Sequence, residues 1–285
     1  MIDYERLMNR HFPPVRQTLT KRDCILYALG VGLGGDPCNA AQLRFLYEEG
    51  LQALPTMAAV LAYPGFWLKD ADCGVDWLRI VHGEQRLAIH RPLPVEGEII
   101  GRTRVAGIVD KGPGKGAIIY STREIVDGAT GTPYATVEQS AFCRGDGGFG
   151  GPSGPAWPVH PLPERTPDRI CDLPTLPQQA LLYRLNGDLN PIHADPDLAR
   201  AAGFERPILH GLCTLGIAGH ALLRGVCNYD PARFGTLAVR FSAPVYPGET
   251  IRTEMWSDGA VVSFRARVLE RDAIVLNNGR LGLAQ

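Results

Sequence analysis

Two absences limit the classes of function open to this sequence. The chain of 285 residues contains no apolar run near the length of about 20 residues that a membrane-spanning helix needs. It has almost no net charge, with 29 basic residues against 30 acidic ones. Because nucleic acids and anionic membranes attract broad basic surfaces, we expect neither as a partner. A local basic patch for an anionic ligand is still compatible with this balance.

Closely spaced cysteines are also absent. An odd number of scattered cysteines favours free thiols in a reducing compartment over a disulfide framework. Residues 1–14 are polar and charged, unlike a signal peptide, and the last three residues are not a peroxisomal address of the Ser-Lys-Leu type. We therefore expect a cytoplasmic protein. The seven cysteines are Cys24, Cys38, Cys73, Cys143, Cys171, Cys213 and Cys227.

Glycine and proline are concentrated in one stretch. Half of residues 145–168 are one or the other, a density that neither a helix nor a central strand tolerates. We interpret this stretch as a linker. It separates an N-terminal unit, residues 1–144, from a C-terminal unit, residues 169–285, and the two flanks are of similar length.

The two flanks share four features in the same order. These are a Leu-Tyr-x-Leu motif, an Asp-Pro pair, an apolar segment rich in small residues, and a strand-like segment that runs through proline into Gly-Glu-x-Ile. Any one match is weak, but four in one order indicate a duplicated unit. The pairs are Leu26–Leu29 with Leu182–Leu185, Asp36 with Asp195, Leu54–Ala62 with Ile208–Leu223, and Leu87–Ile100 with Leu237–Ile251.

Each unit reads as a helix followed by strands. Residues 211–226 are apolar on every side, which predicts a helix buried all round. Residues 260–268 alternate apolar and polar, and residues 101–110 and 116–127 are also strand-like. A buried helix wrapped by an antiparallel sheet is the hot-dog arrangement. The sequence therefore predicts an α+β double hot dog, with two antiparallel sheets that each wrap a buried central helix.

A polar cluster lies on the loop before that helix. Asp188, Asn190 and His193 fall within six residues, and such clusters on loops with rigid flanks are often active sites. Asp and His can exchange a proton with a water molecule held between them. The structural alternative is that Asp188 caps a turn and His193 is a core histidine. Asp195 is excluded from the cluster because Asp195-Pro196 is typical of a helix N-terminus.

The start of the buried helix offers a second chemical feature. Free N–H groups at a helix N-terminus carry partial positive charge, and Gly211 has no side chain to block a ligand. The Gly211 N–H could therefore serve as an oxyanion hole for the carbonyl oxygen of a substrate. The alternative is a simple tight turn that enters a helix. His210, the preceding residue, is more readily explained by structure than by catalysis.

With these residues in place, the chain resembles the (R)-specific enoyl-CoA hydratase family, the hydratase 2 or MaoC-like dehydratase proteins of double hot-dog type. The resemblance covers nearly the whole chain. It implies that Asp188 and His193 are the acid–base pair, that Asn190 positions substrate or water, and that Gly211 polarises the thioester. The motifs that carry the resemblance are D-x-N-P-x-H-A-D-P at residues 188–196, G-F-x-x-P-I-L-H-G-L at residues 203–212, residues 239–256, His82-Gly83-Glu84-Gln85, and the glycine run at residues 147–151.

The first unit lacks the Asp–His pair. When Tyr27 is aligned with Tyr183, Gly32 stands opposite Asp188, and no histidine follows before the Asp-Pro pair. We interpret this half as a degenerate copy that shapes the acyl pocket, as the resemblance also implies. Pro55 predicts that the segment equivalent to the buried helix is distorted and partly open. The expected substrate-binding residues are Leu54, Met57 and Val60 on that segment, with His82, Glu84 and His210.

The predicted activity is hydration of trans-2-enoyl-CoA to (3R)-hydroxyacyl-CoA and the reverse dehydration. We expect no metal and no separate cofactor, since CoA is part of the acyl-CoA thioester substrate. The glycines at residues 30–35 lack the dinucleotide-binding spacing and a βαβ context. A hot-dog acyl-CoA thioesterase, a dehydratase acting on an acyl-carrier protein and a non-catalytic acyl-CoA binding protein stay open as alternatives. A homodimer is compatible with the edge-to-edge association common among hot-dog sheets.

Overall fold

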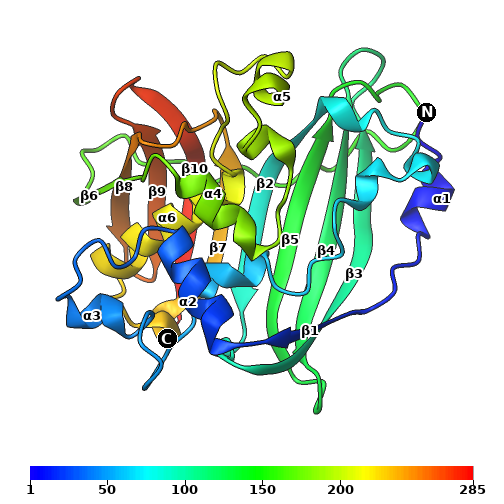
Figure 1. The fold of residues 1–285 in the computed structure, drawn as a ribbon. Coiled ribbons are helices and arrows are strands. Elements are labelled where there is room, and N and C mark those ends of the chain that lie inside the picture. The colour runs from blue at the N-terminus through cyan, green and yellow to red at the C-terminus, as the bar shows by residue number, and fades with distance from the viewer. Residues whose placement is uncertain (285) are drawn as a thin grey trace.

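A ten-stranded antiparallel sheet is the main element of the computed structural model, which describes residues 1–284. The strand order across the sheet is β1-β3-β4-β5-β2-β7-β10-β9-β8-β6, and Figure 1 shows the sheet curving across the whole molecule. The strands are β1 (Val15–Leu19), β2 (Ile80–Ile89), β3 (Gly97–Asp110), β4 (Ala117–Asp127), β5 (Pro133–Cys143), β6 (Arg169–Pro174), β7 (Phe234–Phe241), β8 (Thr250–Asp258), β9 (Val261–Val268) and β10 (Ala273–Leu283).

The strand order is symmetric about its centre. Five strands from each half follow the same internal order, so β1 to β5 correspond to β6 to β10. This correspondence confirms the duplication inferred from the sequence and the double hot-dog fold. One detail differs from the prediction: the two sheets are continuous, because β2 pairs with β7 along residues 84–88. Each half thus supplies the edge that completes the other.

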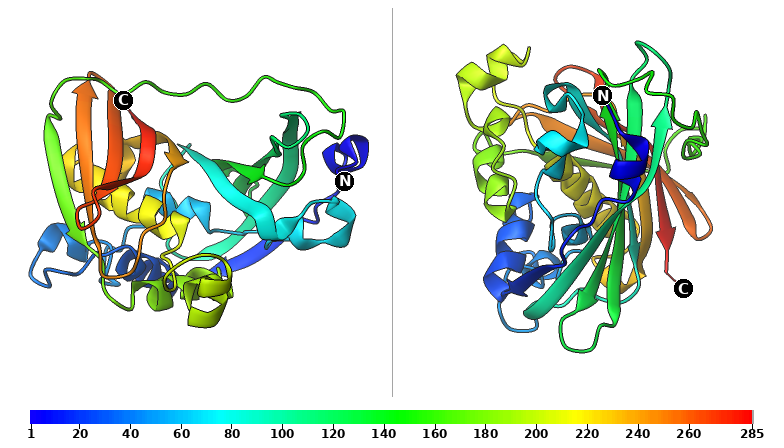
Figure 2. Two further views of the ribbon diagram at one scale, coloured as in Figure 1. Left: turned by 90° about the horizontal axis from the view of Figure 1, so that it is seen from above. Right: turned by 90° about the vertical axis from the view of Figure 1, so that its right-hand side faces the viewer.

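The central helix of the C-terminal half is α6 (Gly211–Gly225), within one residue of its predicted range. Residues 213–223 are all buried, as expected for a helix that is apolar all round. It packs against β6, β8 and β10, and Figure 2 shows it held within the curve of the C-terminal strands. Among residues 1–284, no helix is both long and apolar enough to cross a membrane.

The N-terminal half has no counterpart of that length. Its apolar segment forms only the 3₁₀ turn η1 (Pro55–Ala59), with Pro55 at the first position, and η1 packs against α6. Leu54 and Met57 are each only 2% exposed. The segment is therefore distorted, as predicted, but the expectation that it is partly open at Leu54 and Met57 is wrong in this structure. Val60 is half-buried and packs against the core.

The other helical elements are short and lie mostly at the ends of the strands or over the concave side (Figures 1 and 2). The α-helices are α1 (Tyr4–Met8), α2 (Lys21–Gly30), α3 (Ala40–Leu43), α4 (Gln179–Tyr183) and α5 (Pro196–Ala201). The 3₁₀ turns are η2 (Trp67–Lys69), η3 (Ala71–Cys73), η4 (Trp77–Arg79), η5 (Arg184–Asn186), η6 (Pro191–His193) and η7 (Pro231–Arg233).

The Gly/Pro-rich stretch crosses the convex side of the sheet as an extended chain, visible in Figure 2 between the two halves. Specific contacts fasten it there. The Trp157 ring packs against Tyr120 with centroids 4.4 Å apart, and His160 hydrogen-bonds to Ser263. At its start, the Asp110 carboxylate accepts backbone N–H groups from the glycine run. The concave side is therefore left for the helices and for the candidate site.

Candidate functional site

The loop between α4 and α5 is held by its own polar side chains. The Oδ1 atom of Asp188 accepts the backbone N–H of Asn190 at 3.1 Å, and the Oδ1 atom of Asn190 accepts the N–H of Ile192 at 3.2 Å, which caps η6. Asp195 caps α5 through the N–H groups of Asp197 and Leu198, as the sequence predicts. Asp188 and Asn190 therefore fix the loop while their remaining polar atoms stay exposed.

His193 is aimed by a single backbone bond. Its Nδ1 lies 2.8 Å from the carbonyl oxygen of Ile208, so Nδ1 carries the proton and donates it there. Nε2 is left as the ring atom able to accept a proton. The side-chain ligand atoms of Asp188, His193 and His210 all lie within 4.8 Å of one another. The structure therefore brings Asp188 and His193 together at bridging-water distance.

His210 contacts both members of this pair. Its ring stacks on His193 with centroids 3.7 Å apart, and its Nε2 donates to the backbone oxygen of Asp188 at 3.1 Å. Burial, followed by the neighbouring His193, lowers the pKa of His210 to about 4. Burial also lowers the pKa of His193, although the Ile208 carbonyl and the Asp188 carboxylate oppose that shift. Both rings are thus neutral near pH 7, which suits His193 to accept a proton.

The first half of the chain contributes His82 to the candidate site around Asp188 and His193. The pairing of β2 with β5 shifts register between His82 and Glu84, and this bulge breaks the strict alternation of side chains. His82 therefore shares the concave face with Gln85, and its ring lies 4.5 Å from Phe241. Burial is the main cause that lowers the pKa of His82 to about 4, and the charge of Asp188 is close enough to oppose it.

Glu84 does not belong to this site. The same bulge leaves Glu84 on the convex face of the sheet, where its oxygens lie 3.5 Å from Arg240 and 3.6 Å from Arg86. Burial raises the pKa of Glu84, with Arg240 and Arg86 acting against that shift. The prediction that Glu84 contacts substrate is therefore wrong. It ties β2 to β7 at the seam between the two halves.

The N-terminus of α6 faces the same group of side chains. Gly211 is exposed, and its backbone N–H bonds to no acceptor within residues 1–284. A Cβ at Gly211 would lie 3.3 Å from the Phe241 ring, so a larger residue would crowd the approach to this N–H. A donor at a helix N-terminus, next to a carboxylate and a neutral imidazole, can polarise a carbonyl oxygen while the pair handles a proton.

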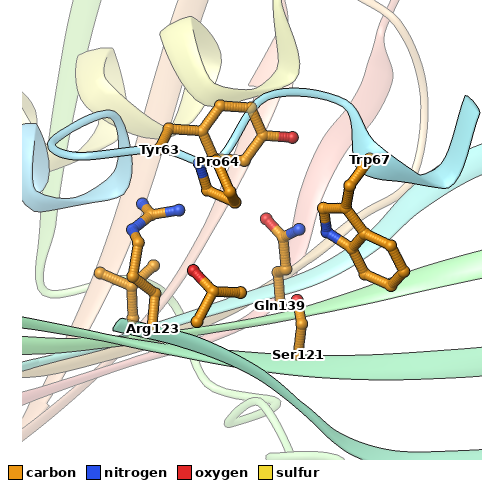
Figure 3. Close-up of a pocket in the computed structure, with 8 residues that line it drawn as sticks. Tyr63, Pro64, Trp67, Ser121, Arg123 and Gln139 are labelled. Atoms are coloured by element: carbon orange, nitrogen blue, oxygen red, sulfur yellow. The ribbon is translucent and has the colours of Figure 1, made fainter. Parts of the chain in front are cut away.

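Two further residues near the site were not identified from the sequence. Tyr63 and Arg123 line a small cavity in the N-terminal half (Figure 3). Desolvation is the main cause that raises the pKa of Tyr63, and the Asp188 carboxylate adds to the rise, which places Tyr63 near the loop. No motif marks either residue, because their proximity depends on how strands far apart in the sequence pair.

Comparison with known families gives two complementary matches. The MaoC like domain matches residues 159–278, and the MFE-2 hydratase 2 N-terminal domain matches residues 17–145. The chain belongs to the MaoC-like hydratase 2 family. The two matched segments are the two halves of the double hot dog, and the candidate site draws residues from both.

Relatives of this MaoC-like chain match its sequence along nearly its full length. Enoyl-CoA hydratase 2, peroxisomal, from Arabidopsis thaliana is 39% identical, over 95% of this chain and 92% of the relative. The 3-hydroxyacyl-thioester dehydratase Y of Mycobacterium tuberculosis is 40% identical, over 91% of each. The crystal structure of a MaoC-like dehydratase from Phytophthora capsici superimposes with a TM-score of 0.88 at 34% identity, and covers 100% of this chain and 98% of the other.

The cluster in this MaoC-like protein also has the composition of a weak metal site. Asp188, His193 and His210 could each offer one ligand atom. However, His193 uses Nδ1, and His210 uses Nε2, as donors to backbone carbonyls. These bonds orient both rings and leave one nitrogen of each ring free within residues 1–284, an arrangement that suits a proton acceptor as well as a metal ligand. The expected independence from metal stays a prediction.

Proposed function

We propose that this protein adds water across the C2–C3 double bond of trans-2-enoyl-CoA and catalyses the reverse dehydration. The observation that carries the proposal is the convergence of Asp188, His193 and the Gly211 N–H at the N-terminus of α6. The names of its relatives, which include enoyl-CoA hydratases and a 3-hydroxyacyl-thioester dehydratase, support this substrate class.

In the proposed mechanism, the Gly211 N–H and the dipole of α6 draw electron density onto the thioester oxygen. This makes C3 electrophilic. A water molecule held between Asp188 and His193 attacks C3, and the pair takes one proton from that water. The same site returns a proton to C2, so one molecule of water is added and no redox change occurs. Asn190 holds the loop that positions Asp188.

The first prediction is the product's configuration. Membership in the hydratase 2 family leads us to expect (3R)-hydroxyacyl-CoA from crotonyl-CoA and longer enoyl-CoAs. Loss of absorbance of the conjugated thioester measures the rate, and chiral analysis measures the product. A predominantly 3S product would contradict the proposal.

The same assay separates the alternatives. A thioesterase would release free CoA thiol, which a thiol-reactive dye detects, whereas a hydratase leaves the thioester intact. A pure binding protein would bind acyl-CoA without loss of absorbance. A comparison of CoA with carrier-protein thioesters tests the acyl-carrier alternative. Exhaustive EDTA treatment should leave the rate unchanged, because the proposed steps use only side chains and a backbone N–H.

A cytoplasmic location and a homodimer complete the proposal. Several relatives have peroxisomal names, so fractionation of the source cells is the measurement that distinguishes the two compartments. Sedimentation of the purified chain tests the dimer.

A further inference from the structure

Arg123 is a buried cation with no acidic partner within residues 1–284. It lies on the concave face of β4, between Thr103 of β3 and Val137 of β5, and is 4% exposed. One terminal nitrogen donates to the carbonyl oxygen of Ala59 at 2.7 Å, and Nε has no partner within residues 1–284. The cavity beside it contains no acidic side chain; it is lined by Tyr63, Pro64, Trp67, Thr103, Ser121, Arg123, Val137 and Gln139.

Such an arrangement is unfavourable unless something compensates the charge. Buried guanidinium groups are normally paired with a carboxylate, and an unpaired one bears the full desolvation cost. Burial lowers the pKa of Arg123 to about 10, and Tyr63 is the charged or ionisable neighbour that opposes the shift. The backbone carbonyl oxygens of Ala59 at 2.7 Å and Ala58 at 3.4 Å compensate only part of the cost. Within residues 1–284, no carboxylate acts on Arg123.

Tyr63 lines the cavity and is close enough to the candidate site for the charge of Asp188 to affect it. The Arg123 guanidinium lies 5.2 Å from the centre of the Tyr63 ring, and Figure 3 shows it pointing toward the segment that carries Tyr63 and Pro64. The charge of Asp188 reaches the Tyr63 hydroxyl, as the raised pKa of Tyr63 indicates after desolvation. Tyr63 therefore borders the cavity of Arg123 and also the surroundings of the Asp188 loop.

We propose that the N-terminal half selects acyl-CoA substrates whose acyl chain carries a carboxylate remote from the thioester, with Arg123 as the counter-ion. This inference rests on the proposed function. The planar guanidinium offers several donors in a fork that matches a carboxylate. The Oγ1 of Thr103 has no partner within the described chain, and Ser121 and Gln139 line the same space. All three can donate hydrogen bonds to carboxylate oxygens.

Binding requires movement at the rim. The cavity of about 10 Å³ holds roughly one water molecule, so a carboxylate enters by displacing that water and the Tyr63 ring. Tyr63 suits this role because it is 38% exposed and lies between η1 and η2, outside any helix or strand. Ala62 and Gly65, which flank the Tyr63–Pro64 pair, both adopt positive φ angles. The backbone conformation of the turn is therefore set by these two residues, and the Tyr63 side chain is not needed to hold it.

The test compares substrates matched in chain length. One series carries a terminal carboxylate and the other a terminal methyl group, and each includes trans-2-enoyl-CoAs for turnover and saturated acyl-CoAs for calorimetric binding. We expect the wild-type protein to prefer the carboxylate series at one chain length. Arg123→Met should weaken binding and lower kcat/KM for that substrate by about 10- to 100-fold, the range for a lost charge-assisted hydrogen bond. The methyl series should change little or improve.

Two variants control the result. Arg104→Met removes an exposed arginine from the opposite face of the adjacent strand and should change neither series. Arg123→Lys keeps the charge but loses the fork, so it should retain part of the preference and serves if Arg123→Met does not fold. A wild-type protein that binds the methyl series equally well or better overturns the inference, as does an equal effect of Arg123→Met on both series. Selective binding of the carboxylate series without any turnover would uphold this inference and contradict the proposed hydratase instead.

Discussion

The two carboxylate oxygens of Asp188 have different roles: one makes a structural hydrogen bond, and the other is free for the proposed chemistry. Oδ1 accepts the Asn190 N–H and so defines the turn, whereas Oδ2 makes no hydrogen bond within residues 1–284. The structural alternative, that Asp188 only caps a turn and His193 only fills the core, thus explains part of the geometry but not their approach to His210 and Gly211. Substitution can separate the two roles, because an asparagine side chain can still accept the Asn190 N–H.

At Asp188 and His193 we predict a loss of turnover without a matching loss of stability. Asp188→Asn and His193→Ala should each reduce kcat by about 10²–10⁴-fold, the usual contribution of a positioned acid or base. If both groups hold one water, the double variant should be little worse than the poorer single variant. Melting temperature and turnover should be measured on the same preparations. Two well-folded single variants with near-wild-type turnover would defeat the proposed mechanism.

At the scale of elements, α6 and η1 meet through a glycine. A Cβ at Gly219 would lie 2.5 Å from Cγ2 of Thr56, too close for any real contact, and a Cβ at Gly216 would lie 2.4 Å from Cγ1 of Val31. Both glycines lie on faces of α6 that receive segments of the N-terminal half. The buried helix of one unit is therefore the surface on which the shortened segment of the other unit packs.

For Gly219→Ala we expect destabilisation, although alanine favours helices by about 1 kcal/mol over glycine. Overpacking against the buried Thr56 should cost about 1–3 kcal/mol and outweigh that gain. Thermal or denaturant unfolding measures the change. A second substitution, Thr56→Ala, removes the clashing methyl group and should restore most of the loss. A Gly219→Ala variant more stable than wild type would contradict this prediction, because it would show that η1 can shift away from α6 at little cost.

At the scale of the whole molecule, one sheet and one interior serve both halves. The interior buries several histidines as neutral groups. His220 on α6 is 1% exposed, and its Nε2 lies 3.1 Å from the Tyr229 hydroxyl. Burial lowers the pKa of His220 to about 4, as it does for His82 and His210. In the unfolded chain a histidine titrates near pH 6.5.

We therefore predict that stability falls as pH drops below about 6.5. The unfolded chain binds protons first, since the folded-state pKa values are depressed to about 4, so the stabilisation present above pH 6.5 is lost as pH falls toward 4. Melting temperature measured between about pH 7 and pH 5 should decline. The melting temperature of His220→Gln should decline less steeply with falling pH than that of the wild type. The melting temperature of His11→Gln, a control at an exposed histidine, should change with pH as in the wild type. Parallel curves for His220→Gln and wild type would contradict this account.

The sequence by itself determined the features that depend on local pattern. The apolar run at residues 211–226 was enough for α6, because a helix buried on every side needs no polar face. Asp195-Pro196 marked the start of α5 through the fixed φ of proline and the capping carboxylate. The order of four weak motifs revealed the duplication that the strand order confirms. Asp188, Asn190 and His193 were found together because they are close in the sequence.

Only the tertiary structure decided which distant residues face one another. A bulge at residue 83 turns His82 toward the site and Glu84 away from it, and a shift of one residue in register reverses the face of every side chain. The burial of Leu54 and Met57 depends on how η1 packs against α6. Arg123 and Tyr63 meet because β4 and an irregular segment approach across the concave face. Such contacts follow from pairing and packing between segments far apart in the chain, which the local pattern of residues does not encode.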